Sequence, residues 1–347
     1  MKSRDKILQS ISDHSPPISE KIKERLLGEP PLRYVNGEPF ACSNPDPYLE
    51  YYTEQCRFAL SDGATTSTTH QDVLDMIDLL RTPITRTELE QKLCCRPGSS
   101  NAPADQGPLI HLAARSILMM NLGDFRGTIP GHSGLTWKEG CLKEYVRRRF
   151  HQPVLMSGDR VKLEKTFTAQ NLYRIGGLEI RFTNNLDDHL RLTEEDKVVE
   201  IFHQVSFLEH QRHSSIYPDG LVDETFRTLA LLFPQFDRST QTWFRKLCSS
   251  QRFAIDDRVL RCSWCRAEDR QIQNFRFWHD RLVILKQVYD EARPGTVSQW
   301  WHDRRNGVQW YTFWVAVLVL ALTVFFGLVQ SVEGALQVYK AYHPTPS

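Results

Sequence analysis

The sequence has no excess of charge of either sign. Its 347 residues hold 43 Lys and Arg against 42 Asp and Glu, which leaves a formal net charge of +1. Non-specific nucleic-acid binding needs a basic field over the protein, so we expect no nucleic-acid partner. Cysteine is also sparse, because eight cysteines are spread along a long chain, and this excludes a disulfide scaffold. With 41% hydrophobic and 24% charged residues, the chain can bury a core.

The N-terminal residues MKSRDKILQSISDHS lack the continuous apolar segment of a signal peptide, because Asp5 and other polar residues interrupt it. No asparagine begins an Asn-X-Ser/Thr triplet, the acceptor of N-glycosylation. We therefore expect the N-terminal part to be made and kept in the cytosol.

The signature loops of several enzyme classes are also missing. The sequence has no Walker A loop, no Gly-x-Gly-x-x-Gly after a strand, no His-Glu-x-x-His and no Gly-x-Ser-x-Gly. The segment GHSG at residues 131–134 has its second glycine one position early and no apolar strand before it, so we interpret it as a loop. The sequence thus predicts no catalytic, cofactor-binding or metal-binding residue and no cofactor.

Two short patterns resemble parts of metal sites. Cys262 and Cys265 have half of a zinc-site spacing, which only the distant His279 or His302 could complete. We favour structural or unpaired thiols, and metal binding at this pair stays open. A second group consists of His203, Glu209, His210 and His213. Positions 203 and 210 lie two helical turns apart and do not easily share one metal ion, so we interpret these histidines as solvated or packing side chains.

One long apolar run stands near the C-terminus. Residues 311–329, YTFWVAVLVLALTVFFGLV, contain no charge and would form a helix of about 28 Å at ~1.5 Å per residue, the thickness of bilayer hydrocarbon. The preceding WWHDRRNGVQW supplies tryptophans and arginines typical of a membrane interface: Trp300, Trp301, Arg304, Arg305 and Trp310. The run therefore predicts a single transmembrane helix in a lipid bilayer. The alternative is a buried core helix.

Charge around this run predicts its orientation. Arg304 and Arg305 precede it, whereas Lys340 follows it, so the N-terminal side should face the cytosol. Because only residues 330–347 follow, we expect a tail-anchored protein inserted after translation, with the endoplasmic reticulum or another endomembrane favoured over the mitochondrial surface. Small residues recur every four positions at Gly327, Ser331 and Ala335, and this spacing raises the hypothesis of a homodimer. The alternative is that small residues are common near the ends of spans.

The fold class we predict is mainly α with a small β-hairpin. The patterns divide the chain into a partly disordered, proline-containing arm at 1–68, a helical subdomain at 69–151, a helical domain with a hairpin near 178–202 at 152–293, an interfacial hinge at 294–310, the transmembrane helix at 311–329 and a short tail at 330–347.

Within residues 69–151, apolar periodicity predicts helices that start near Thr69, after Thr85 and around Leu109. Thr85 and Glu88 have the spacing of a capping box. Three short helices resemble a helix-turn-helix, but the third offers little beyond Arg115 to contact DNA, so a plain helical core is favoured.

Another helix is predicted after Thr136-x-x-Glu139 and ends in three arginines at 147–149. These arginines complement the helix dipole, and a phosphate or lipid-headgroup site is the alternative.

The hairpin is predicted from LEIRFT at 178–183, turn residues at 184–185 and a second strand at 198–202. The clearest helical stripe is predicted over 271–291 and faces either the core or a protein partner: Ile272, Phe275, Trp278, Leu282, Leu285 and Tyr289.

Two long segments have distinctive wording: FWHDRLVILKQVYDEARPGTVSQWW with the anchor that follows, within 277–344, and FTAQNLYRIGGLEIRFTNNLDDHLRLTEEDKVVEIFHQVSFLE at 167–209. Both segments resemble a large group of filamentous-fungal proteins that carry a C-terminal transmembrane anchor. The group implies no established activity, and some members are associated with secondary-metabolite genes. Our leading hypothesis is a non-enzymatic interaction or recruiting module on an endomembrane. The alternative is a membrane-tethered enzyme or accessory protein of fungal secondary-metabolite biosynthesis.

Overall fold

The computed structural model describes residues 10–11, 20–28, 46–62, 68–94, 107–123, 134–151, 153–156, 161–251, 253–292 and 307–342. Contacts group residues 1–173 and 177–291 into one compact unit, which we call the globular unit. A second unit comprises residues 174–176 and 292–347 and contains the long C-terminal helix.

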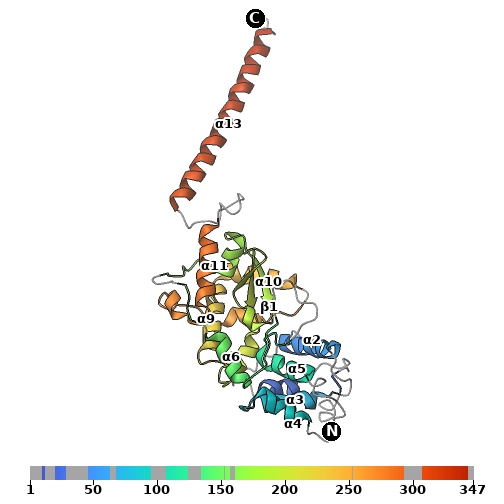
Figure 1. Ribbon diagram of the computed structural model, residues 1–347. Coiled ribbons are helices and arrows are strands. Elements are labelled where there is room, and N and C mark those ends of the chain that lie inside the picture. Colours follow the sequence, from blue (N-terminus) through green and yellow to red (C-terminus); the bar gives the residue numbers. More distant parts are fainter. Residues whose placement is uncertain are drawn as a thin grey trace, which may run out of the picture. The chain divides into compact units, whose positions relative to one another are not determined.

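The described elements are mostly helices, so the predicted fold class is confirmed (Figure 1). The helices are α1 (Glu20–Leu27), α2 (Pro47–Ser61), α3 (His70–Leu80), α4 (Arg86–Cys94), α5 (Gly107–Leu118), α6 (Leu142–Phe150), α7 (Ala169–Arg174), α8 (Val205–Gln211), α9 (Leu221–Leu232), α10 (Arg238–Ser249), α11 (His279–Glu291) and α13 (Gly307–Tyr342). Short 3-10 helices are η2 (Leu186–Asp188), η3 (Asp257–Arg261) and η4 (Ile272–Asn274). The strands are β1 (Glu179–Thr183), β2 (Arg191–Thr193) and β3 (Val198–Phe202).

The three strands form one sheet in the order β1-β3-β2. β1 runs parallel to β3, with Glu179 opposite Val198, so the predicted hairpin between these two segments is wrong. The hairpin instead joins β2 to β3, with Arg191 opposite Glu200. Its turn places three consecutive acidic residues at positive φ, at 194–196. All five residues of β3 are buried, as expected for a central strand that is paired on both edges.

Side-chain caps start two of the predicted helices. Thr69 and Asp72 form a reciprocal capping box at the start of α3. At α4, the Thr85 backbone N donates to Glu88 Oε2 at 2.9 Å and the Glu88 backbone N donates to Thr85 Oγ1 at 3.3 Å. Both predicted helix starts are therefore confirmed.

Two described helices, α1 and α2, lie within the segment interpreted as an arm. Asp46 caps α2, and Pro47 occupies the first position of the helix. A proline is tolerated there because the backbone N–H that it lacks would have no partner within the helix. The hydroxyls of Tyr48 and Tyr51 donate to backbone carbonyls of α5 at 2.8 and 3.2 Å. Pro47 thus marks a helix start, and α2 belongs to the buried core.

Two predicted helix starts are wrong. α6 begins at Leu142 and not after Thr136, because Gly140 at φ +73° breaks the helical backbone before it. α11 begins at His279 and not at 271. The buried carboxylate of Glu224 accepts hydrogen bonds from the backbone N of residues 276, 277 and 278, which holds this segment out of a helix.

The stripe predicted as a core or partner surface is buried. Every member is at most 1% exposed, so the stripe belongs to the core and offers no free surface to a partner: Ile272, Phe275, Trp278, Leu282, Leu285 and Tyr289. The partner interpretation of these six residues is thus wrong. Their spacing was correct as a sign of burial but carries no information on whether the covering atoms belong to the same chain.

Candidate functional site

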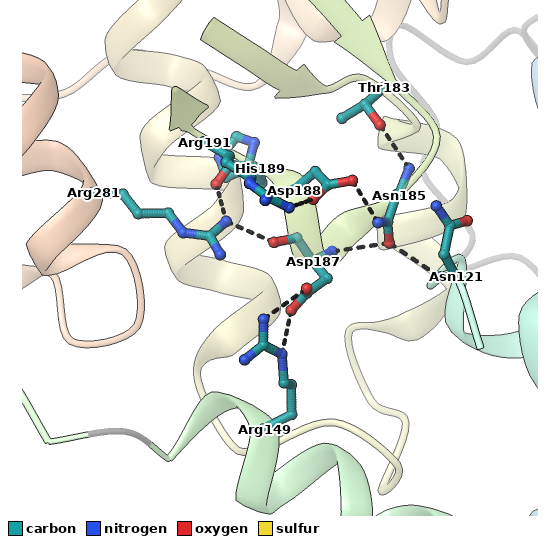
Figure 2. A network of polar contacts seen from close by, with 9 residues as sticks. All are labelled: Asn121, Arg149, Thr183, Asn185, Asp187, Asp188, His189, Arg191 and Arg281. Atoms are coloured by element: carbon teal, nitrogen blue, oxygen red, sulfur yellow. Dashed lines mark hydrogen bonds and ion pairs between the residues drawn. The ribbon is translucent and has the colours of Figure 1, made fainter. Parts of the chain in front are cut away.

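A network of polar contacts surrounds the segment 184–190, between β1 and β2 (Figure 2). Asn185 organises it: its Oδ1 accepts from the backbone N of Asn121 at 3.2 Å, and its Nδ2 donates to Asp188 Oδ2 at 2.6 Å. Its backbone N donates to Thr183 Oγ1 at 3.0 Å. Hydrogen bonds among residues 183–188 therefore fix the shape of this segment, apart from its contacts with charged residues of other elements.

Two arginines from distant helices converge on Asp187 (Figure 2). Arg149, in the last turn of α6, donates Nε and Nη2 to its two carboxylate oxygens at 2.7 and 2.8 Å, and this hydrogen bonding raises the pKa of Arg149. Arg281 of α11 donates Nη1 to the backbone carbonyls of Asp187 and His189, both at 2.6 Å. Burial lowers the pKa of Arg281. One of the three arginines predicted at 147–149 is thus committed to an internal ion pair.

His189 lies buried at the end of the same segment. Its Nδ1 accepts from the backbone N of Phe202 at 3.1 Å, so Nε2 carries the proton and faces Thr228 Oγ1 at 2.7 Å. Burial lowers the pKa of His189 to about 3, so the imidazole is neutral. Its ring stands edge-on to Trp278, 4.9 Å between centroids. The cluster ties α6, the sheet, α9 and α11 together, and its polar groups are taken up in mutual contacts.

Sequence reasoning missed this cluster, because Asn184 and Asn185 were interpreted only as turn residues. The signal was present: a run of polar residues, NNLDDH, lies between two apolar strands at 184–189. Polar residues placed there are buried with the strands and need hydrogen-bond partners. A small cavity of about 110 Å³ lies beside Arg149, Asp187 and Arg281.

The histidines interpreted as packing residues do not converge on a metal. His203 is fully buried, its Nδ1 accepts from the backbone N of Asp256 at 3.3 Å, and burial lowers its pKa to about 3. Burial also lowers the pKa of His210, to about 4, whereas His213 is exposed. Among the described residues, no group of three or more His, Cys, Asp and Glu side chains is placed to hold a metal ion.

Cys262 and Cys265 are held separately. Their thiols donate to the carbonyls of Arg258 at 3.6 Å and Arg227 at 3.4 Å. Burial raises the pKa of both, to about 11 for Cys265. His302 and the residues 131–133 of the GHSG segment lie outside the described part of the chain.

A cavity of about 1030 Å³ among the described residues was not predicted. It lies between α2, α10 and residues 253–261, and Leu49, Phe244 and Leu260 contribute apolar walls. Glu50 also lines the cavity, and its carboxylate already has a hydrogen-bond partner, because Oε2 accepts from the backbone N of Ala254 at 2.9 Å. Burial raises the pKa of Cys248, another lining residue, to about 12, so this thiol is not an activated nucleophile.

The predicted apolar helix is present and longer than the predicted span. The segment Trp310–Tyr339 of α13 is long and apolar enough to cross a membrane, with a mean hydropathy of 2.5 in its most apolar window, where no residue is buried. Gly327, Ser331 and Ala335 are exposed, and a homodimer through them stays a prediction. The flanking arginines at 304–305 and tryptophans at 300–301 lie outside the described residues.

Comparison with known proteins gave no match to the chain from protein-family models, curated proteins or solved structures. The resemblance to the fungal group therefore stays a prediction.

Proposed function

We propose that the protein is a single-pass membrane protein in which α13 is the span and the globular unit is displayed at the cytosolic surface. One observation carries this proposal: α13 is apolar on all sides and unburied along its most apolar window. A core helix of a soluble protein buries its apolar side chains against other elements. In hydrocarbon, a helix bonds its own backbone and needs no such cover.

The arginines at 304–305 against the single Lys340 support the cytosolic placement of the globular unit. The proposal includes a tail anchor in the endoplasmic reticulum or another endomembrane. It also includes membership in the fungal group, on the resemblance of residues 167–209 and 277–344.

The activity we propose is non-enzymatic, an interaction or recruiting module. The polar cluster around Asp187 supports this, because its hydrogen-bonding groups serve one another and it offers no activated nucleophile. The recruiting surface must lie elsewhere than the buried stripe. The second candidate, a membrane-tethered enzyme or accessory protein of secondary metabolism, is favoured by one observation, the 1030 Å³ cavity, which has the size of small-molecule sites.

Membrane extraction tests the anchor. The full chain, expressed in cells and isolated with microsomes, should remain in the pellet after carbonate washing. Leu320→Arg with Val324→Arg should release it, since each arginine at the centre of a helix costs about 3 kcal/mol of insertion free energy. The matched control is Leu155→Arg, at a side chain of the globular unit that is 81% exposed, and it should stay in the pellet.

Protease added outside intact microsomes should digest the globular unit. Release of the wild-type chain by carbonate would contradict the anchor, and protection of the globular unit would contradict its orientation. The cavity is tested separately: a small molecule that co-purifies with the wild type and is lost in Leu49→Trp would favour the second candidate, because the larger ring takes up part of the cavity beside α2.

A further inference from the structure

A groove of about 550 Å³ lies beside the turn between α9 and α10. Its apolar wall comes from the end of α9 and the residues after it, Ala230, Leu231 and Pro234. Two aromatic residues, Phe236 and Trp264, stand at its rim and are 72% and 49% exposed. Exposed apolar side chains that lie together at the rim of a concave site are typical of surfaces that bind a ligand.

The aromatic pair is held in place by the backbone. The backbone N of Gln235 donates to the carbonyl of Ser263 at 3.3 Å, so the residues that follow each of them, Phe236 and Trp264, stand next to each other. Their rings meet edge to face, with 6.0 Å between centroids. Ser263 has φ +88°, a conformation that L residues rarely adopt.

Three cations line the same groove: Lys165, Arg266 and Arg270. None of them forms an ion pair with a described carboxylate. Nε of Arg270 is buried and has no hydrogen-bond partner among the described residues. The lining carboxylate, Asp237, is already used, because it accepts from Ser239 N and Thr240 Oγ1 at the start of α10.

We infer that this groove binds an anionic amphiphile, a molecule with a carboxylate or phosphate head and an apolar chain. The chain lies along the α9 wall and against Phe236 and Trp264, and the acidic head accepts hydrogen bonds from Arg270 and Arg266. Guanidinium groups without a carboxylate partner bind such heads with charge-assisted hydrogen bonds. The inference does not depend on α13 spanning a membrane, since a free fatty acid and a bilayer lipid share this chemistry.

Photolabelling of the full chain in phosphatidylcholine nanodiscs tests the inference. The probes are a diazirine-bearing palmitate, a diazirine-bearing phosphatidylserine and, as the uncharged counterpart, the methyl ester of the palmitate probe. Mass spectrometry of peptides then locates the labels. We expect the acidic probes to label peptides that contain residues 230–237 and 263–267, and the ester to label them about tenfold less. Label from phosphatidylserine identifies a bilayer lipid as the source, and label from palmitate alone identifies a free acid.

Variants separate binding from general partitioning. Lys165→Gln, Arg266→Gln and Arg270→Gln together should reduce groove labelling about tenfold, because the head loses its charged donors. The charge-matched control replaces three exposed lysines elsewhere and should change labelling less than about twofold: Lys92→Gln, Lys138→Gln and Lys246→Gln. Trp264→Ser, at a half-exposed position, should also lower the groove labelling.

Label on α13 reports contact with the bilayer and serves as the internal standard. Label on α13 without label in the groove would overturn this inference and leave the anchor intact. Label in the groove without label on α13 would overturn the anchor and support the groove. Equal groove labelling by the acid and its ester, or by the wild type and the triple variant, would also overturn the inference.

Discussion

Acid should destabilise the globular unit, because the buried imidazoles of His189 and His203 stay neutral in the folded chain and take up protons when it unfolds. His203 gives the sharpest test. It is fully buried, and its neutral Nδ1 accepts from the backbone N of Asp256. His203→Asn places an amide oxygen near the position of Nδ1 and keeps the acceptor, but removes the proton-binding site. The variant therefore isolates titration from the loss of the hydrogen bond.

The sign follows from the two pKa values. Burial lowers the pKa of His203 from 6.5 to about 3 in the folded chain, so the unfolded chain takes up the proton first as the pH falls. The stability that this group contributes is present above pH 6.5 and is lost progressively toward pH 3. At ~1.4 kcal/mol per pH unit, His203 alone should lower the free energy of unfolding by about 2.7 kcal/mol between pH 7 and pH 4.5.

Urea titrations of the full chain in a nonionic detergent, followed by tryptophan fluorescence at half-unit pH steps, measure this effect. Wild type and His203→Asn should converge by about 2–3 kcal/mol between pH 7 and 4.5. The raised pKa of Asp256, caused first by burial, acts in the opposite direction but is present in both proteins and cancels in the difference. His213→Asn, at an exposed imidazole, is the matched control and should follow the wild type.

Parallel curves for wild type and His203→Asn, separated by a constant free energy, would refute the reasoning. They would mean that the buried imidazole does not remain neutral while the chain is folded, or that water reaches it. A second proton would have to add at Nδ1 of His203, because Nε2 already carries the hydrogen of the neutral ring, and it would replace the hydrogen bond from Asp256 N by two donors that face each other.

Three further stability predictions use the same urea titration at pH 7. Asp187→Ala should cost about 2–4 kcal/mol, because Arg149 loses both acceptors and stays half-buried; the exposed Glu195→Ala should cost less than about 0.5, and equal costs would contradict the cluster's role. Thr69→Ala should cost about 1 kcal/mol by removing the cap of α3, and Thr69→Ser should restore most of it. Gly123→Ala should cost about 1–3 kcal/mol, because Gly123 has φ +97° and a Cβ would lie 2.6 Å from His111 Nδ1.

Local signals predicted local structure well. Thr69 and Thr85 start α3 and α4 because each cap is built from residues three positions apart. The prediction failed where a distant residue decides. Glu224 holds the backbone of 276–278 out of α11, and no pattern within 271–291 records a carboxylate 52 positions away. The parallel pairing of β1 with β3 is of the same kind, since the strands alone fit either direction.

The polar cluster was missed for a related reason. Asn185, Asp187 and Asp188 are of the types common in turns, and each alone is explained by a solvated loop. Only the arrival of Arg149 and Arg281 from other helices makes them a buried network. The groove could not be predicted either. Phe236 and Trp264 lie in short irregular segments without apolar periodicity, and only the fold brings the two rings together.

The two apolar helical patterns of the chain show what periodicity can decide. The stripe that ends in α11 is apolar on one face, and the globular unit covers that face, so its partner is the same chain. Residues 311–329 of α13 are apolar on every face, which no single contact with a protein surface can satisfy. A one-sided apolar stripe therefore does not indicate whether the same chain or another protein buries it, and only the fold decides this. Residues 311–329 carry no charge, and an all-round apolar pattern of this length favours surroundings of low polarity; this is why the anchor could be proposed from the sequence while the recruiting surface could not.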